Sequence, residues 1–458
     1  IEDRAPVYIV KLSGDLRHAD TLHPLQNILA RLRQKKASAL AVSCAGVQRV
    51  SASGIAGFLD FLVADHPVAV SAYDLPRHLI TRLNNHGLTT VLPIFKTLAA
   101  TLQSDAFRQS SLTTTSAVIL GAGTGQRLWP LTQSQCAPCL DIAGVPLVGR
   151  LQGHLSRYGI RTIFSNPGHF GDNLITAMRQ HSGPMQSLFF TPNTGLSTAG
   201  QVLADLHQVH AAFEEDVLVA NGNALVSIDL AELVHFHKNS GADMTIALSG
   251  SSTLMPANSR AGNQPDPAVC VIKPECLQGI TDTACLSTIG DVSKSLTTLG
   301  AKIRVFRTAG KTLQVRTGHD FYTAVHAILT GALDGQAPSG QQIDETVWHH
   351  PTARVHSNTL FEGHIHIGAH SVVDKTAILK GCVSLGRRCK VDAHSYLRDS
   401  VVLDNTTLAQ NALVDRQVAN ETWSFSHPFA DGRSTRVLPL EPSMMSASQE
   451  PRIALGSA

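Results

Sequence analysis

The sequence predicts a multidomain protein in which α/β domains are followed by an all-β region. Three observations lead to this fold class. The chain has 458 residues, which is enough for roughly two to four domains. Apolar β-branched strands alternate with amphipathic helices through the N-terminal and central parts, as they do in α/β folds. Near residue 355 an internal repeat of six residues begins, which indicates a parallel β-helix.

Residues 1–105 are predicted to form the first α/β domain. Two apolar runs, at 7–12 and 39–44, have the composition of buried strands. An apolar helix is expected at 54–62, and another helix is expected to begin at Arg77, directly after a proline. This order of strands and helices predicts a small sheet covered by helices.

This N-terminal part resembles the STAS domain, the small α/β module of anti-sigma-factor antagonists and anion-transporter tails. The resemblance rests on the segment that begins Leu12-Ser-Gly-Asp, on the turn from Val47 to Gly54, and on Asn85-His-Gly-Leu. It implies that a protein partner, such as a kinase or an anti-sigma-like protein, binds this domain.

Ser53 is the candidate phosphorylation site in this domain. In the STAS family a phosphorylatable hydroxyl stands at a helix N-terminus, where a phosphate meets N–H groups and the positive end of the helix dipole. Ser53 matches the second hydroxyl of the family's turn, while Ala52 stands at the usual phosphoacceptor position. The alternative is that Ser51 and Ser53 only cap the helix, which contributes about 1 kcal/mol.

A second α/β domain is predicted at 116–335, after a polar and aperiodic linker at 106–115. Its first strand, Ala117–Leu120, runs into a loop at 121–125 that holds three glycines. Glycines let the backbone turn tightly and approach a ligand, and the amide groups of such a loop can cradle phosphates. Arg127 adds a planar, permanently charged guanidinium for the same phosphates.

The region from Leu120 to Pro146 resembles the signature of sugar-1-phosphate nucleotidyltransferases, the pyrophosphorylases that make nucleotide sugars. In that signature L-x-A-G-x-G-x-R-L-x-P-L-T is followed by P-K-P and an I-A-G-x-P turn. Further segments match in order: the base-contacting loop at 197–201, the metal-binding strand end at 216–223 and the final segment at 319–324. The resemblance implies a Rossmann-like nucleotidyltransferase α/β domain.

The resemblance also implies a ligand, which is a nucleotide or a nucleotide sugar. In this chemistry a sugar phosphate attacks the α-phosphorus of a nucleotide, and catalysis depends on neutralising the charge that develops. The residues implied to bind the nucleotide are Leu120, Gly121, Ala122, Gly123, Thr124, Gly125, Arg127, Ser197, Thr198, Ala199, Gly200, Asn221, Gly222 and Asn223.

The chain departs from the family pattern at four positions, and each departure removes a charge. Ala137 stands where the P-K-P segment has its lysine. Asn223 stands at the family's metal-binding aspartate, and Gln314 aligns with the second one. The family's sugar-phosphate lysine has no counterpart between Ser249 and Pro267. Amide oxygens carry no charge, so little is left to hold Mg²⁺ beside a triphosphate.

These losses predict a catalytically impaired nucleotidyltransferase-like protein with a regulatory or scaffolding role in nucleotide-sugar or exopolysaccharide metabolism. Loss of one charged partner typically slows a reaction about 10²–10³-fold. The alternative is an active sugar-1-phosphate nucleotidyltransferase that uses Arg127 and Mg²⁺ and releases pyrophosphate; no cofactor is expected otherwise. A third alternative is a structural subunit without a ligand. An active enzyme would need other residues to supply the missing charges, and the candidates are Asp141, Asp229, Asp243 and Lys273.

A left-handed β-helix of hexapeptide repeats is predicted at 347–416, and it resembles the C-terminal domain of many nucleotidyltransferases. Six residues make one flat side of a triangular coil, so about three coils are expected. Two positions of each hexad are expected to point inward. The first is held by Val355, Phe361, Ile367, Val373, Leu379, Leu385, Val391, Leu397 and Leu403. The second is held by Thr359, Ile365, Ser371, Ala377, Val383, Cys389, Ser395, Val401 and Thr407.

Self-association is the role expected of this region, so a homo-oligomer is predicted. The alternative role, acyl transfer, needs a catalytic histidine between coils. We expect the histidines here to be solvated side chains instead. Residues 417–458 lack a repeat and are expected to be a flexible tail. The histidines that qualify by residue type are His356, His364, His366 and His370.

Composition narrows the remaining functions. A formal net charge of +2 argues against a broad nucleic-acid surface. No apolar run reaches the ~20 residues that a membrane span needs. The eight cysteines lack a disulfide-like spacing, and a cytoplasmic protein is therefore expected. Cys136 and Cys139 have the spacing of a redox or zinc pair, which is a weak signal without a second pair.

Overall fold

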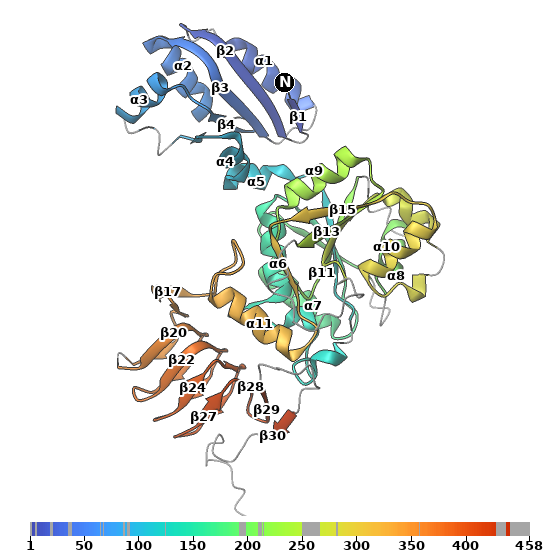
Figure 1. The fold of residues 1–458 in the computed structure, drawn as a ribbon, viewed down its shortest axis with the longest axis vertical. Helices are drawn as coiled ribbons and strands as arrows, with labels where there is room; N and C mark the ends of the chain where they lie inside the picture. The colour runs from blue at the N-terminus through green and yellow to red at the C-terminus, as the bar shows by residue number, and fades with distance from the viewer. Residues whose placement is uncertain are drawn as a thin grey trace, which may run out of the picture.

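The computed structural model has three regions that follow one another along the molecule (Figure 1). An N-terminal sheet lies at one end, a larger sheet with helices lies at the centre, and a β region lies at the other end. The chain is therefore a multidomain α/β and β structure, as the sequence predicts. The structure describes residues 2–4, 7–18, 22–34, 39–64, 66, 68–85, 88, 92–123, 125–191, 198–208, 213, 215–249, 266–280, 283–356, 358–426 and 437–439.

The N-terminal sheet has the strand order β1-β2-β3-β4-β5. β1 (Glu2–Arg4) runs antiparallel to β2 (Val7–Leu16). The pairs that β3 (Ala39–Val50) makes with β2 and with β4 (Ala69–Tyr73) are parallel, as is the pair of β4 with β5 (Ile94–Phe95). The two predicted strands are confirmed, and both run beyond the apolar segments that predicted them.

Three helices cover one face of this sheet: α1 (His23–Gln34), α2 (Ala52–Val63) and α3 (Arg77–Asn85). Both predicted helices are therefore confirmed. Their apolar side chains share one core with the strands, in which Phe58 and Leu79 are almost completely buried.

The two serines before α2 have different environments. Ser51 is the N-cap, because its Oγ accepts a hydrogen bond from the Gly54 amide over 3.0 Å. Ser53 lies in the first turn of the helix and is exposed. Gly54 is required here, because a Cβ on it would lie 2.0 Å from the Leu16 carbonyl oxygen. The capping role therefore belongs to Ser51, while phosphorylation of Ser53 stays a prediction.

The predicted linker at 106–115 is mostly helical, because it contains α5 (Asp105–Ser111). Phe107 of α5 is 0% exposed and packs with residues of the N-terminal strands. Together with α4 (Leu98–Gln103), α5 covers the second face of the N-terminal sheet. The large apolar residues of this polar segment, Phe107 and Leu112, lie five positions apart and give no helical periodicity, so the sequence pattern did not reveal this packed connection.

The central sheet has the strand order β10-β9-β6-β11-β14-β13-β15. Its neighbours are parallel except that β14 (Val269–Ile272) runs antiparallel to both β11 and β13. A separate antiparallel pair is formed by β12 (Ala224–Ser227) and β16 (Lys311–Gln314). The other strands are β6 (Ser116–Leu120), β9 (Thr162–Asn166), β10 (Ser187–Phe190), β11 (Val217–Asn221), β13 (Met244–Ser249) and β15 (Ile303–Thr308).

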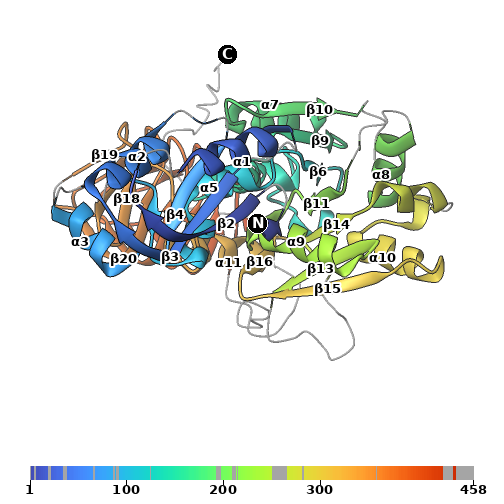
Figure 2. The same ribbon diagram turned by 90° about the horizontal axis from the view of Figure 1, so that it is seen from above.

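Side chains of the central strands alternate between two cores, one on each face of the sheet. In β6, Ala117 and Ile119 face one core and Val118 faces the other. The strand is buried on both sides, which explains its continuous apolar run. The first core includes residues of α6 (Leu147–Arg157), α7 (Gly171–His181) and α9 (Leu230–Ser240), and the second includes residues of α8 (Ala199–Gln208) and α10 (Ile289–Thr298) (Figure 2).

The C-terminal region is built from short, mostly parallel strands. Leu360 of β20 (Leu360–Ile367) pairs with Ile378 of β22 (Ile378–Leu385), which lies 18 residues further along the chain. Three hexads make 18 residues, so this pairing is the one that a three-sided coil requires. The other strands are β17 (Gln341–Asp344), β18 (Val347–His349), β19 (Arg354–Val355), β21 (Val372–Val373), β23 (Lys390–Val391), β24 (Tyr396–Arg398), β25 (Val401–Val402), β26 (Thr407–Leu408), β27 (Leu413–Asp415), β28 (Gln417–Ala419), β29 (Trp423–Ser426) and β30 (Val437–Pro439).

The hexad register changes near residue 400, which corrects three predicted inward positions. Ser384 pairs with Val401, which is 17 residues further on. The inward positions after this turn are therefore one residue earlier than predicted. Val402 is 0% exposed and lies in the core of the repeat. The predicted Val401 instead packs in the core shared with α11, and the predicted Leu403 and Thr407 are only partly buried. A strict six-residue pattern cannot foresee a turn that is one residue shorter.

The predicted flexible tail is wrong at its start, because β28 and β29, joined by a short turn, occupy residues 417–426. Phe425 and Trp423 are buried in the same core as α11 (Gly318–Leu329). A Cβ on Gly318 would lie 2.7 Å from the Phe425 ring, so the ring packs directly on the helix. Two aromatic residues supply enough apolar area to order a short segment. Most of the later tail lies outside the described residues.

Phe425→Ala is expected to lower the free energy of unfolding by about 3–5 kcal/mol, because it removes a buried ring and leaves a cavity beside α11. The urea midpoint measures this loss. Leu413→Ala is the matched control in the same region: its side chain is 59% exposed, and a change of at most about 0.5 kcal/mol is expected. Equal urea midpoints for the two variants would contradict the packing of Phe425 on α11 and would support the predicted flexible tail.

His366 does not fit the expectation of solvated histidines. It is 1% exposed, its Nδ1 lies 3.1 Å from Ser384 Oγ, and its Nε2 lies 3.3 Å from Ser339 Oγ. Burial lowers the pKa of His366 to about 3. Its ring is therefore neutral and serves packing between β20, β22 and the segment before β17. Of the other three candidates, His356 and His370 are exposed and His364 is partly buried.

Acid is expected to destabilise the protein between pH 6.5 and about pH 4. Burial lowers the pKa of His366 to about 3 and that of His154 to about 4, from an ordinary 6.5. The unfolded chain binds more protons than the folded chain in this window, so stability falls as the pH falls. Burial raises the pKa of Asp141 to about 6, which opposes this trend. We expect the combined effect of the two histidines to exceed that of this one carboxyl group. Urea midpoints at several pH values measure how steeply stability falls with pH. We expect this slope to be shallower in His366→Gln than in the parent protein. Equal slopes in the two proteins would contradict the burial of a neutral His366.

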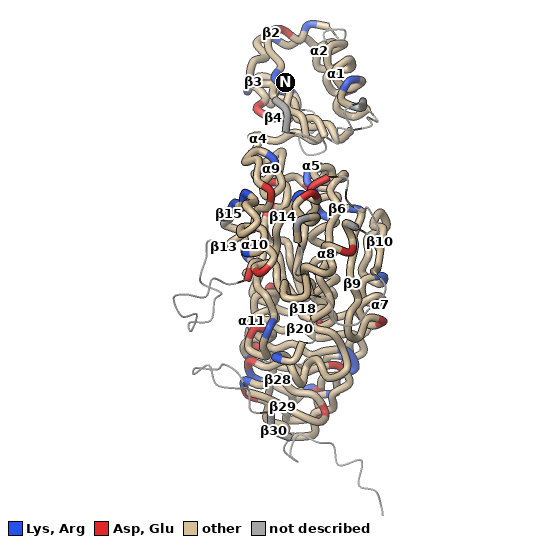
Figure 3. Tube along the Cα trace, turned by 90° about the vertical axis from the view of Figure 1, so that its right-hand side faces the viewer, with Lys and Arg blue, Asp and Glu red and all other residues tan. Residues whose placement is uncertain are grey.

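No helix within the described ranges is long and apolar enough to cross a bilayer. Figure 3 shows Lys and Arg interspersed with Asp and Glu along the molecule, without one stripe of a single sign. This distribution accords with the small net charge of +2.

Candidate nucleotide-binding site

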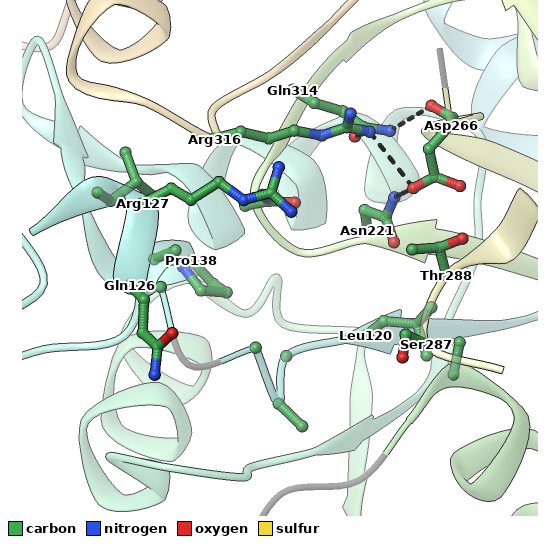
Figure 4. Close-up of a pocket in the computed structure, with 18 of the residues that line it drawn as sticks. Leu120, Gln126, Arg127, Pro138, Asn221, Asp266, Ser287, Thr288, Gln314 and Arg316 are labelled. Carbon is green, nitrogen blue, oxygen red and sulfur yellow. Dashed lines mark hydrogen bonds and ion pairs between the residues drawn. The ribbon is translucent and has the colours of Figure 1, made fainter. Parts of the chain in front are cut away.

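A cavity of about 480 Å³ opens at the carboxyl ends of the central parallel strands (Figure 4). Leu120, the last residue of β6, lies opposite Asn166 of β9 and Asn221 of β11. All three residues line the cavity. Open α/β sheets bind ligands at this edge, because the loops that follow the strands meet there.

The glycine loop after β6 needs its first and last glycines. A Cβ on Gly121 would lie 2.3 Å from a side chain of α7, and Gly125 has a φ of +65° with Thr132 in the way of a Cβ at 2.8 Å. A Cβ on Gly123 would meet nothing within 4 Å, so this position is open. The Gly121 amide donates to Asn166 Oδ1 over 3.2 Å and therefore holds the loop in place.

Most of the residues predicted to bind the nucleotide lie in the cavity wall. Those in the wall are Leu120, Gly121, Ala122, Gly123, Gly125, Arg127, Ala199, Asn221 and Asn223. Thr198, Gly200 and Gly222 are not among the lining residues. Thr124 and Ser197 lie outside the described residues. The wall also contains Gln126, Leu128, Asn166, Val202, Ser287 and Thr288, which the sequence did not single out.

The three predicted residues outside the wall hold the backbone around it. The Thr198 hydroxyl donates to the first carbonyl of the 3-10 helix η7 (Thr283–Cys285), and the Gly200 amide donates to the Leu286 carbonyl over 3.0 Å. Both contacts fix the start of α8. The Gly222 amide donates to the last carbonyl of β6 over 2.9 Å. These residues therefore shape the site without facing it.

Asn223 and Gln314, which the resemblance assigns to one metal site, lie together in the wall. The pairing of β12 with β16 sets Ala224 opposite Gln314 and so brings the two amides to one place. Asn223 Nδ2 donates to the Val315 carbonyl over 2.9 Å. Gln314 Nε2 donates to the Asp266 carbonyl over 2.9 Å. Both side chains are thus held by the protein itself.

Two charged residues that the sequence did not single out face each other in the wall. Arg316 Nη2 lies 3.4 Å from Asp266 Oδ2 and also donates to Gln314 Oε1 (Figure 4). Asp266 Oδ1 accepts from the Gly290 amide over 2.8 Å. Among the described lining residues, Asp266 supplies the one carboxylate.

The antiparallel strand β14 explains why Asp266 reaches the site. Because β14 runs opposite to β11, its amino end lies at the carboxyl end of β11, and the Asn221 amide donates to the Ala268 carbonyl over 2.9 Å. A residue just before β14 must therefore lie near the cavity. The direction of a strand is not visible in its local sequence, so only the topology could have pointed to Asp266.

Ala137 and Pro138 line the cavity from the short 3-10 helix η4 (Ala137–Cys139). Ala137 therefore brings a methyl group, and no charge, to the wall. The replacement charges proposed from the sequence are wrong, because none of the four lies in this wall. Asp141 lines a second cavity, Asp229 caps α9, and Asp243 pairs with Lys273 over 3.3 Å.

The residues present do not fit a Mg²⁺ ion. No group of three His, Cys, Asp or Glu side chains that could hold a metal occurs among the described residues. Mg²⁺ is usually held by one or two carboxylates together with phosphate oxygens. The carboxylate of Asp266 is already paired with Arg316, and that guanidinium also covers Gln314 Oε1. A cation placed here would meet the positive charge of Arg316.

Comparison with known proteins identifies the central region. Residues 116–257 match the family model described as nucleotidyl transferase, and the match begins at β6 and contains the glycine loop. The chain contains a nucleotidyl transferase domain. The wall residues from Leu120 to Asn223 lie within this match. The wall residues that follow the match in the chain are Asp266, Ser287, Thr288, Gln314 and Arg316.

Three curated relatives show the family of this nucleotidyl transferase domain. N-acetylmuramate alpha-1-phosphate uridylyltransferase of Neisseria meningitidis is 34% identical over 25% of this chain and 48% of its own. UTP–glucose-1-phosphate uridylyltransferase of Synechocystis is 21% identical over 66% of this chain and 86% of its own. Mannose-1-phosphate guanylyltransferase of Mycobacterium tuberculosis is 29% identical over 29% and 36%. All three are sugar-1-phosphate nucleotidyltransferases, although this chain spans only about half of the first and about a third of the last.

Proposed function

We propose that this protein is a catalytically impaired nucleotidyltransferase-like protein that binds a nucleotide or a nucleotide sugar. Its role is regulation or scaffolding in nucleotide-sugar or exopolysaccharide metabolism. The names of the relatives each pair a nucleotidyl group with a sugar 1-phosphate, which supports the ligand class. The cavity of about 480 Å³ is of the size that small-molecule sites usually have.

The observation that carries the proposal is the guanidinium of Arg316 on Gln314 Oε1. Gln314 aligns with a metal-binding aspartate of the family, and in this chain a permanent positive charge stands directly beside it. Arg316 also pairs with Asp266, the carboxylate of the wall. The chain thus supplies a fixed cation at the place where the family pattern has an acidic ligand for a divalent one.

Two arginines in one wall suit phosphate groups without a metal. Arg127 and Arg316 both line the cavity, and a guanidinium offers planar, charge-assisted hydrogen bonds to phosphate oxygens. Binding a phosphate is not the same as transferring a nucleotidyl group, which needs charges placed where negative charge develops. Ala137 brings no charge to the wall, and this absence favours a binding role over turnover.

Calorimetry with nucleoside triphosphates and nucleotide sugars, each with Mg²⁺ and with a chelator, tests the proposal directly. We expect at least one of these ligands to bind equally well in both conditions. Incubation with the bound triphosphate and a panel of hexose 1-phosphates should release no pyrophosphate. Mg²⁺-dependent release of pyrophosphate would overturn the proposal, and the absence of any binding would leave a structural domain.

A second candidate, an active sugar-1-phosphate nucleotidyltransferase, has one observation in its favour. Asp266 is a carboxylate in the wall, and its side chain is 17% exposed. If a nucleotide phosphate drew Arg316 away from it, Asp266 could accept a cation together with the phosphates. This candidate requires binding that depends on Mg²⁺ and requires pyrophosphate release, so the same experiment separates it from the first.

The flanking regions complete the proposal. We propose that 1–105 is a STAS-like domain that binds a protein partner, which the order of its parallel strands and helices supports. Region 116–335 is the nucleotidyltransferase-like domain. Region 347–416 is a left-handed β-helix that mediates self-association, which the 18-residue pairing of its strands supports. Light scattering of the whole chain tests the oligomer.

A further inference from the structure

Cys136 and Cys139 form a close pair of thiols that the nucleotide site does not explain. Their Sγ atoms lie 3.1 Å apart, and both are free cysteines. The residues between them form a tight turn, because the Cys139 amide donates to the Cys136 carbonyl over 3.0 Å. Such a turn brings its two ends within about 7 Å at the Cα atoms, which includes the distances that a disulfide spans. A bond between the two sulfurs therefore needs little movement of the backbone.

The pair lies between two cavities. Ala137 and Pro138, the residues inside the turn, line the nucleotide site. Cys139 is half-buried and lines a second cavity of about 790 Å³, whereas Cys136 is 3% exposed. On the side of the nucleotide site, Pro138 lies against the turn between β11 and β12, because a Cβ on Gly222 would lie 3.1 Å from Pro138 Cγ. The turn thus connects the Cys139 thiol, which lines the second cavity, to the wall of the nucleotide site.

We infer that Cys136 and Cys139 form a reversible disulfide in response to a hydroperoxide, and that this bond stiffens the wall of the nucleotide site. In the first step the Cys136 thiolate attacks one peroxide oxygen, the O–O bond breaks, and the leaving hydroxide or alkoxide takes up a proton. The Cys139 thiol then attacks the sulfenic sulfur of Cys136. The S–S bond forms, the S–O bond breaks, and water leaves with the thiol proton. Two thiols lose two electrons, and the peroxide gains them.

The surroundings of the two sulfurs assign their roles. The contact between the two thiols holds the pKa of Cys136 below its ordinary value, while the same contact and burial raise the pKa of Cys139. Cys136 is therefore the thiolate that attacks, and its burial restricts the oxidant to a small molecule. In the reverse reaction an added dithiol reaches the Cys139 sulfur through the second cavity, and Cys136 leaves as the more stable thiolate.

Formation of the bond does not depend on the proposed function, whereas its effect on nucleotide affinity rests on it. The effect on the wall can be measured without a ligand. A covalent link across η4 should slow amide hydrogen exchange in the peptide that carries the turn between β11 and β12, because Pro138 packs on Gly222. This readout stays valid even if no nucleotide binds.

The test treats the whole purified chain with increasing hydrogen peroxide, blocks the remaining thiols and maps the peptides by mass spectrometry. We expect the peptide that holds both cysteines to lose two hydrogen atoms at peroxide levels that leave Cys285 unmodified, although Cys285 is exposed. Dithiothreitol should restore both thiols. Prior modification of Cys285, or a pair that dithiothreitol cannot reduce, would overturn the inference.

Two variants sharpen the result. In Cys139→Ser the partner thiol is lost, so Cys136 should stop at the sulfenic acid and become labelled by dimedone. In the matched control Cys285→Ser the disulfide and the slower exchange near Gly222 should both remain. A disulfide that forms without any change in that exchange would remove the link between the thiols and the nucleotide site.

Discussion

Arg127→Ala is expected to weaken nucleotide binding by roughly tenfold to a hundredfold while leaving the melting temperature unchanged. Hydrogen bonds to a charged group contribute about 1.5–3 kcal/mol, and every 1.36 kcal/mol is about a factor of ten in affinity. Arg127 lines the cavity and is exposed. It makes no hydrogen bond or ion pair with another described residue, so its removal should cost the fold little. Calorimetry with the best ligand from the screen, without Mg²⁺, measures the loss.

Arg161→Ala is the matched control for this variant. Arg161 is also exposed, but it precedes β9 and therefore lies at the other end of the strand from Asn166 and the cavity. Its removal should change neither affinity nor stability. If both variants bind as the parent protein does, the glycine loop is a structural turn; if Arg127→Ala unfolds, the arginine supports the fold.

The largest gain of function is expected when the three positions that exclude a metal are changed together. Asn223→Asp and Gln314→Glu restore two carboxylates at nearly constant shape, and Arg316→Ala removes the guanidinium that covers Gln314 Oε1 and pairs with Asp266. Three carboxylates would then meet in one wall, which suits a divalent cation beside phosphates. Nucleotide binding, independent of Mg²⁺ in the parent protein, should become strengthened by Mg²⁺ by about tenfold or more.

The double variant Asn223→Asp/Gln314→Glu, with Arg316 retained, is the control. In it the carboxylate introduced at position 314 would pair with the Arg316 guanidinium, so little effect of Mg²⁺ is expected. Titration of both proteins with nucleotide at several Mg²⁺ concentrations separates the two. An equal response to Mg²⁺ in the double and the triple variant would show that Arg316 does not stand in for the metal.

Local sequence was sufficient where the structure depends on neighbouring residues. The apolar run at 117–120 predicts a strand buried on both faces, and β6 has this environment. The glycines at 121 and 125 predict a tight loop, and both positions are too crowded for a Cβ. Asn223 and Gln314 were found by resemblance, and strand pairing places them together. The rest of the site follows from contacts between distant segments.

Asp266 and Arg316 show why those contacts were missed. They lie 50 residues apart in the chain and meet because β14 runs antiparallel while β16 pairs with β12. No periodicity within a segment encodes either pairing. The ordered start of the predicted tail has the same cause, since Phe425 is placed by its packing on α11. His366 is buried because neighbouring strands cover it, although its hexad position suggested solvent.

By itself the sequence determined the order of α/β and β regions, the glycine loop, the six-residue repeat and the uncharged side chains of Ala137, Asn223 and Gln314. These features are encoded by short-range patterns of apolar side chains, glycines and charges. Only the tertiary structure decided which charges meet in the cavity, where the repeat changes register and which aromatic residues order the segment after it. Those outcomes depend on strand direction and long-range packing, because side chains far apart in the chain become neighbours only when the sheet has formed.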